Sequence, residues 1–213
     1  MITQETIIAA LHGYAPRPIS TNRDFSVLIP LVEKNGVPHI LFEVRADELD
    51  VQPGEISFPG GAIEEGETKQ EAAVRETVEE LGVVQSDINV LAELNYLVTY
   101  SNLTVYCFLG SIPCRAIETS TINRAEVKET FMVPLSFFLE TEPVRYINRI
   151  IIEPDPGMPY EKISPSGEYA WHTGTNNVFI YTWSEPNTGK ERIIWGMTAK
   201  LIYDFMQLIG RQI

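Results

Sequence analysis

The sequence has few cysteines, few basic residues and no long apolar runs. Two cysteines among 213 residues, Cys107 and Cys114, exclude a disulfide framework and form no metal-binding motif. No apolar run approaches the ~18 residues that a membrane-spanning helix requires. The first residues also lack the basic and apolar regions of a secretory signal. These absences predict a soluble, cytoplasmic protein that does not associate with membranes.

The charge balance is strongly acidic, because 16 Lys and Arg residues stand against 29 Asp and Glu residues. A formal charge of −13 repels a phosphate backbone, so nucleic-acid binding is not expected. A small anionic ligand would need positive charge supplied locally, by bound cations or by a few arginines.

The order of the predicted elements indicates a mixed α/β fold in a single domain over residues 1–213. Strands before and after a central helix favour a layered sheet over a bundle or a β-sandwich. Helices are expected at residues 3–12, 69–81 and 198–209, and strands at 25–32, 39–44, 88–98, 103–109, 143–152 and 178–183. A short strand leading into a short helix is expected at 131–139, and the proline-rich residues 153–177 are expected to be irregular.

The helix predicted at residues 69–81 is the most informative segment. Thr68 followed by Glu71 is a capping box, and Gly82 is well placed to end the helix. Apolar residues and Thr77 share one arc of this helix, which predicts its buried face. The opposite arc carries a glutamate stripe, made up of Glu76, Glu79 and Glu80.

Like charges at this spacing destabilise a helix, so the glutamate stripe needs a compensating partner. Carboxylate oxygens suit a hard divalent cation such as Mg²⁺ or Mn²⁺. Arg75 lies beside the stripe and can pair with Glu79 or with Glu67 in the preceding loop. The alternative is a solvated acidic face with no ligand.

The spacing of Gly61, Glu67, Arg75-Glu76, Glu79-Glu80 and Gly82-Val83 resembles the Nudix box, the signature of Nudix hydrolases. Thr77 stands where a bulky aliphatic residue is commonest in that box. The resemblance implies a Nudix fold, which is a three-layer α/β/α sandwich around a mixed β-sheet. It also implies hydrolysis of a diphosphate linked to another moiety, by attack of water with help from bound Mg²⁺ or Mn²⁺.

The same resemblance implies roles for individual residues. Glu76 and Glu80 resemble the main metal ligands, with Glu79 as a third, and the backbone of Gly60 and Gly61 resembles a loop that adds a carbonyl ligand. Arg75 with Glu67 resembles a pair that orients the acidic face. Glu126 precedes the strand at 131 and is a candidate for a further acidic ligand or base, with Glu129 as a second candidate; otherwise both are surface charges.

A second pattern lies before the box. Residues 41–46, Gly54 and Phe58-Pro59-Gly60-Gly61 are similar to the motif that marks coenzyme A diphosphatases among Nudix proteins, and residues 194–199 resemble the start of that subfamily's last helix. Asp50 departs from the motif, which usually has arginine there. The resemblance implies cleavage of coenzyme A or acyl-CoA to 3′,5′-ADP and (acyl-)4′-phosphopantetheine. The substrate-binding candidates are Arg45, Gly54, Phe58, Gly60 and Gly61.

Alternatives stay open at several points. The substrate can instead be ADP-ribose or another nucleoside diphosphate derivative, since the box does not select the leaving group. A non-catalytic sensor domain is disfavoured, because the glutamate stripe is intact. Arg45 either binds phosphate or forms an ion pair, and Trp195 belongs either to the core or to a base-stacking surface. A small-molecule substrate is expected as the partner, and a homodimer is compatible with the sequence.

Overall fold

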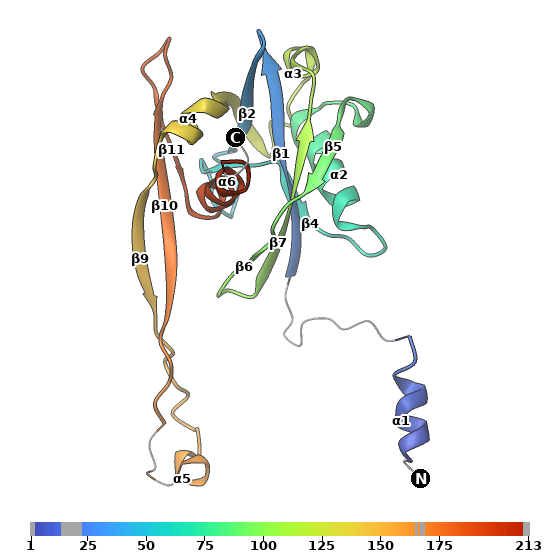
Figure 1. Ribbon diagram of the computed structural model, residues 1–213, viewed down its shortest axis with the longest axis vertical. Coiled ribbons are helices and arrows are strands. Elements are labelled where there is room, and N and C mark those ends of the chain that lie inside the picture. Colours follow the sequence, from blue (N-terminus) through green and yellow to red (C-terminus); the bar gives the residue numbers. More distant parts are fainter. Residues whose placement is uncertain (1–2, 14–22, 165, 167–168, 211–213) are drawn as a thin grey trace.

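The computed structural model describes residues 3–13, 23–164, 166 and 169–210, and its centre is a mixed β-sheet (Figure 1). Its strands follow the order β3-β2-β1-β7-β5. In addition, β4 pairs with β1, β6 pairs with β7 and β8 pairs with β2. These strands are β1 (Arg23–Lys34), β2 (Val37–Arg45), β3 (Ile56–Ser57), β4 (Gly60–Ala62), β5 (Asn89–Glu93), β6 (Leu97–Val98), β7 (Leu103–Ser111) and β8 (Val127–Pro134). Strands β1 and β7 run parallel, whereas β1 and β2 run antiparallel, so the expected mixed sheet is confirmed.

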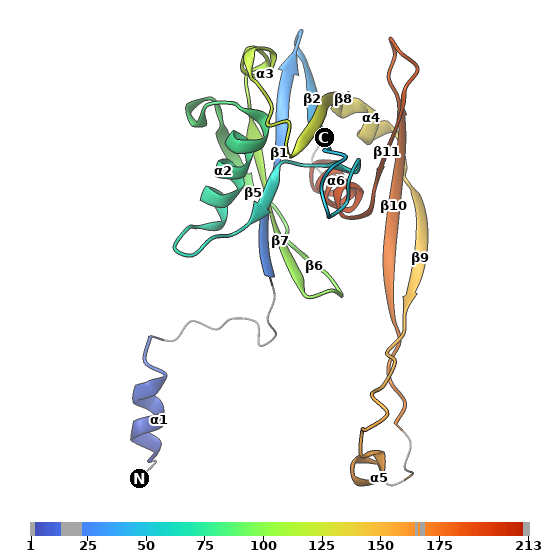
Figure 2. The same ribbon diagram turned by 180° about the vertical axis from the view of Figure 1, so that it is seen from behind.

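Helices α2 (Lys69–Leu81) and α6 (Gly196–Ile209) cover opposite faces of this sheet. The other described helices are α1 (Gln4–Ala10), the 3₁₀ helix η1 (Gln85–Asp87), α3 (Cys114–Thr119), α4 (Leu135–Glu140) and α5 (Tyr160–Ile163); α1 and α5 lie away from the sheet. Successive side chains of a strand point to opposite faces, so Leu28 and Leu41 pack towards α2 while Ile29 and Phe42 pack towards α6. Figures 1 and 2 show α2 and α6 on opposite sides of the sheet, which confirms the three-layer α/β/α arrangement.

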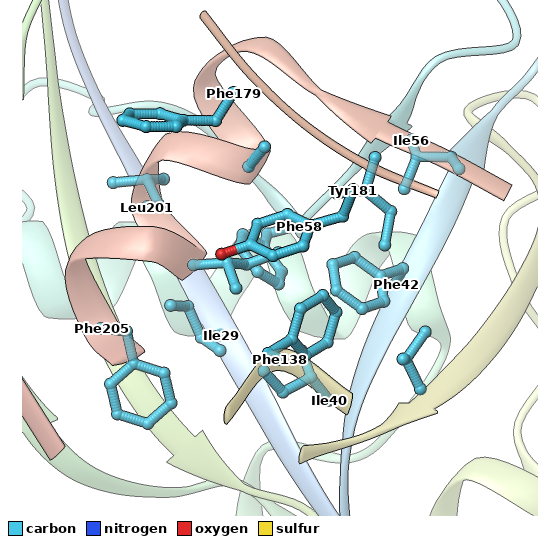
Figure 3. Close-up of a cluster of buried hydrophobic side chains, with 14 of the residues drawn as sticks. Ile29, Ile40, Phe42, Ile56, Phe58, Phe138, Phe179, Tyr181, Leu201 and Phe205 are labelled. Carbon is cyan, nitrogen blue, oxygen red and sulfur yellow. The ribbon is translucent and has the colours of Figure 1, made fainter. Parts of the chain in front are cut away.

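A second sheet lies on the outer side of α6. It consists of β9 (Val144–Ile150), β10 (Gly174–Ser184) and β11 (Glu191–Trp195), in the order β11-β10-β9. Phe179 and Tyr181 of β10 join Leu201 and Phe205 of α6 in one buried cluster with Phe42 of the central sheet (Figure 3). The helix α6 is therefore enclosed between two sheets, which the sequence did not predict.

Several predicted boundaries need correction. The strand expected at 88–98 is interrupted into β5 and β6, and β10 begins at Gly174 rather than at 178. The sequence does not predict strand β11, since residues 194–199 resemble the start of the last helix of the coenzyme A diphosphatase subfamily. The exposure of Ile194 and Trp195 alternates with that of Arg192 and Ile193 in the period of two that a strand requires. Among the described residues, no helix is both long and apolar enough to cross a bilayer.

Arg192 joins the second sheet to the central one. It is 6% exposed, and its Nη1 and Nη2 donate to the two carboxylate oxygens of Glu129 on β8 at 2.8 and 3.1 Å. Its Nε donates to Glu185 at 2.6 Å, and its guanidinium lies 4.4 Å from the ring centroid of Phe131. Hydrogen bonding to Arg192 lowers the pKa of Glu129 to about 2. Glu129 therefore has a structural role rather than the catalytic one considered above.

Replacing Arg192 with alanine should destabilise the protein by about 3 kcal/mol, because Glu129 and Glu185, which are partly buried, lose the buried cation that pairs with both. The pKa of Glu129 is depressed in the folded state, so the stabilisation by this pair is present above the ordinary carboxyl pKa of 4.5 and is lost as the pH falls towards 2. Urea denaturation of Arg192→Ala at pH 7 measures the loss. The control is Lys190→Ala, which removes an exposed cation from the same carboxylate and should cost less than about 1 kcal/mol. Equal stabilities for R192A and wild type would contradict this account.

Candidate active site

Helix α2 has the ends that its sequence predicts. The Thr68 hydroxyl accepts from the backbone N–H of Glu71 at 3.2 Å, and the Glu71 carboxylate accepts from the backbone N–H of Thr68 at 2.7 Å. Gly82 follows the last turn with a φ of +67°, a left-handed conformation that glycine adopts without strain. Thr77 is buried on the core face, where its hydroxyl donates to the carbonyl of Ala73 at 2.7 Å. Thr77, which stands where a bulky aliphatic residue is commonest in the Nudix box, therefore affects the packing of the core and not the acidic face.

The Gly60-Gly61 loop is in close contact with α2. The backbone N–H of Gly60 donates to Oε2 of Glu80 at 2.8 Å. A Cβ atom at position 61 would lie 2.2 Å from Oε1 of Glu76, which is far inside contact distance. A side chain at position 61 would therefore displace the Glu76 carboxylate, and glycine lets the loop approach it in the observed position.

Arg75 connects the helix to the preceding loop. Its Nε and Nη2 donate to the two oxygens of Glu67 at 3.1 and 2.9 Å, and Nη2 also donates to the carbonyl of Ala62 at 3.1 Å. Its Nη1 donates to Glu76 at 2.8 Å and to Glu79 at 3.1 Å. Both pairings considered for Arg75 are therefore present, together with an unexpected one to Glu76. Arg75 is the cation that partly offsets the repulsion within the glutamate stripe.

The position of the glutamate stripe opposite the buried arc of α2 suggests that all three side chains face solvent. In the structure their exposure differs. The side chain of Glu79 is 51% exposed and that of Glu76 is 17% exposed, whereas Glu80 is only 4% exposed. The reason is that the β4 loop covers one flank of α2, and Glu80 points into this contact. The stripe thus runs from solvent to the interior.

Two further carboxylates act on the buried end of the stripe. Burial, together with the negative charges of Glu43, Glu76 and Glu126, raises the pKa of Glu80 to about 9. Burial likewise raises the pKa of Glu43 to about 7 and that of Glu76 above its ordinary value. Glu126 is held by the amide of Asn123, which donates to it at 3.2 Å. The structure therefore brings together four of these acids, which we call the carboxylate cluster: Glu43, Glu76, Glu80 and Glu126.

Glu43 is the site residue that the sequence reasoning missed. It lies in β2 between Phe42 and Val44, is 1% exposed, and lies on the same face of the strand as Leu41, which packs beneath α2. The available signal was a charged residue inside an otherwise apolar strand, because such a residue is rarely buried without a partner. The motif that marks coenzyme A diphosphatases indicates Arg45, two residues later, and not Glu43.

The cluster fits a divalent cation by its chemistry. Within the described residues no three acidic, histidine or cysteine side chains form a coordinating group as they stand. Arg75 and the N–H of Gly60 each donate to a carboxylate of the stripe. All of the available donors are oxygens, which Mg²⁺ and Mn²⁺ prefer. One carboxylate oxygen of Glu43 is buried and has no hydrogen-bond partner among the residues that the structure describes. A cation would relieve both this unsatisfied oxygen and the repulsion within the cluster.

The residues of the predicted substrate motif have different positions. Phe58 is 4% exposed and stacks on Phe42 with ring centroids 5.1 Å apart, so it is a core residue and its assignment to substrate binding was wrong (Figure 3). Gly54 has a φ of +71° and donates its N–H to the carbonyl of Arg45 at 3.2 Å. Arg45 donates from Nε to the carbonyl of Val51 at 3.3 Å. Of the remaining candidates, Trp195 is 43% exposed on β11 rather than in the core.

The layered fold and the acidic helix docked on a glycine loop define a hydrolytic α/β domain. The NUDIX domain family model matches residues 22–150, and the chain accordingly belongs to the Nudix family. It is a Nudix pyrophosphohydrolase. Enzymes of this family act on small nucleoside diphosphate substrates and generally use divalent metal ions.

Similar proteins include two coenzyme A diphosphatases. The mouse peroxisomal coenzyme A diphosphatase NUDT7 is 33% identical over 186 residues, which cover 86% of this chain and 68% of that protein. The human mitochondrial coenzyme A diphosphatase NUDT8 is 32% identical over 187 residues, which cover 87% of this chain and 69% of that protein. Among solved structures, a MutT/nudix family protein from Enterococcus faecalis matches with a TM-score of 0.52 at 14% identity, covering 98% of this chain and 70% of that one. This last likeness concerns the fold alone.

Proposed function

We propose that this enzyme hydrolyses the diphosphate bond of coenzyme A or acyl-CoA with Mg²⁺ or Mn²⁺, giving 3′,5′-ADP and (acyl-)4′-phosphopantetheine. The observation that carries the proposal is that Arg45, Gly54 and the glycine loop of the CoA-type motif belong to one connected structure beside the carboxylate cluster. Arg45 donates its N–H to the carbonyl of Glu55 at 2.9 Å and accepts from Gly54, so the segment folds back next to β2. Similarity to the mouse and human coenzyme A diphosphatases supports the same substrate.

In this proposal Glu76 and Glu80 hold the cation, and Glu79 assists from the solvent side. A bound divalent cation would neutralise the diphosphate and acidify the attacking water. Arg75 and Glu67 position the acidic helix against the glycine loop through their hydrogen bonds. Glu126, whose charge acts on the cluster, is the candidate to accept the proton of the attacking water.

Arg45 is the cation that we assign to a phosphate of the substrate. Its position near Glu43 is indicated by the lowering effect of its charge on the pKa of that carboxyl. Within the described part of the chain the guanidinium donates one hydrogen bond, to Val51, so further donors of its fork are available for phosphate oxygens. Asp50, where the motif usually has arginine, is exposed in the same loop. Because position 50 is an aspartate, Arg45 is the arginine of this motif that the sequence retains.

A substrate panel tests the proposal. Coenzyme A should be cleaved with a kcat/KM at least ~10-fold above that for 3′-dephospho-CoA or ADP-ribose, because binding energy from remote groups lowers the barrier at phosphorus. Arg45→Ala should narrow this gap if the residue binds the 3′-phosphate, and should slow all substrates alike if it binds the diphosphate. Products are resolved by chromatography. If ADP-ribose is cleaved faster than coenzyme A, the CoA assignment is wrong and the alternative holds, which is a hydrolase of ADP-ribose or another nucleoside diphosphate derivative.

A further inference from the structure

Glu43 occupies an unusual place for a carboxylate. It lies in the middle of β2, with Ser57 of β3 as its neighbour on one side and Thr130 of β8 on the other. The residue is 1% exposed, and the adjacent Phe42 is wholly buried in the core. A charged side chain in such a position needs strong compensation, because transfer of a carboxylate out of water costs several kcal/mol.

The chain itself supplies only part of that compensation. Oε1 of Glu43 accepts a hydrogen bond from the Ser57 hydroxyl at 2.9 Å, whereas Oε2 is buried and has no hydrogen-bond partner in the described structure. Buried polar atoms are nearly always paired, so a lone carboxylate oxygen points to a group from outside the chain.

The surroundings indicate the charge of the missing group. The charges that act on Glu43 are those of Arg45, which is favourable, and of Glu126 and Glu76, which are repulsive. Glu43 is also the largest source of charge repulsion on Glu80. A neutral donor would satisfy the oxygen but leave the repulsion, whereas a cation would offset both.

We propose that Glu43 is a further ligand of the divalent cation, and that its free Oε2 closes the inner side of the carboxylate cluster opposite Glu80. The assignment rests on the proposed metal dependence of the enzyme. It gives the site a ligand from the central sheet, in addition to those from α2. A cation held from two elements would be fixed more rigidly than one held by a single helix.

The test is Mn²⁺ binding by Glu43→Gln, measured by electron paramagnetic resonance and by calorimetry at pH 8 without substrate. The variant keeps the size of the side chain and should bind at least one Mn²⁺ about 10-fold more weakly than wild type. Loss of ligands or of the groups that orient them commonly costs 10- to 100-fold in metal affinity. The matched control is Glu65→Gln, because Glu65 is exposed in the loop before α2 and should bind Mn²⁺ like wild type.

Melting temperatures supply a second readout. Without metal, E43Q should melt above wild type, because the buried repulsion is reduced; with Mn²⁺ it should gain less stability than wild type. A higher metal-free melting temperature with unchanged Mn²⁺ affinity would overturn the proposal and make Glu43 a buried acid of structural role. If E43Q does not fold, Glu43→Asp decides, because it keeps the charge but withdraws Oε2 by one methylene: weaker Mn²⁺ binding supports the proposal, and unchanged binding overturns it. Absence of Mn²⁺ binding by wild type would instead refute the metal-dependent function itself.

Discussion

Removal of divalent cations by excess chelator should abolish hydrolysis, and added Mg²⁺ or Mn²⁺ should restore it. In the proposed function the diphosphate binds beside the carboxylate cluster, which without a cation would repel that anion. Product formation from CoA, followed by chromatography before and after addition of the metal, measures the effect. Zn²⁺ is a suitable comparison, since an all-oxygen site without histidine or cysteine disfavours it. Full turnover in metal-free buffer would contradict the assignment of the glutamates as metal ligands.

The same cluster predicts how the stability of the metal-free protein varies with pH. Burial raises the pKa of Glu80 to about 9 and that of Glu43 to about 7, from an ordinary value of 4.5. Above pH 4.5 the unfolded chain releases protons that the folded protein retains, so stability falls as the pH rises towards 9. With Mn²⁺ the fall should be smaller, because the cation takes the place of the protons. Melting temperatures at pH 5.5 and 8.5, with chelator and with Mn²⁺, give the comparison, and a metal-free protein that becomes more stable over this range would contradict it.

Replacing Glu80 or Glu76 with glutamine should lower kcat by about 100-fold or more, which corresponds to ~3 kcal/mol of lost transition-state stabilisation. Glutamine keeps the size and helix propensity of glutamate but removes a charged ligand. At position 80 the amide oxygen can still accept from the N–H of Gly60, so the contact between loop and helix should persist. Steady-state kinetics with saturating Mg²⁺ measures the effect on kcat.

Circular dichroism and melting temperatures distinguish loss of chemistry from loss of fold. Without metal, both variants should be at least as stable as wild type, because one of the repelling charges has been removed. Glu65→Gln, an exposed substitution of the same type, should leave kcat unchanged. A variant that loses activity only by unfolding would show that the stripe is structural.

The features that depend on near neighbours in the chain can be predicted from the amino-acid sequence. The ends of α2 follow from hydrogen bonds that Thr68, Glu71 and Gly82 make within one helical turn. The pairing of Arg75 with Glu67 and Glu79 also spans only a few residues. The resemblance of residues 61–83 to the Nudix box implied the class of enzyme, and the family model confirms it. Such local interactions are encoded by residue type and spacing, whatever the rest of the chain does.

Tertiary structure alone decided which of these groups are buried and which distant residues join them. Glu80 is buried because the β4 loop packs on α2, and Glu43 reaches the cluster because it shares a face of β2 with Leu41, which belongs to the same core cluster as Ala73 and Leu81 of α2. Phe58 became a core residue by stacking on Phe42, and β11 was fixed by pairing with β10 and by the bridge from Arg192 to Glu129. Each of these depends on contacts between residues far apart in sequence. Burial and long-range charge interactions are properties of packing, and the order of residues along one strand or helix does not contain them.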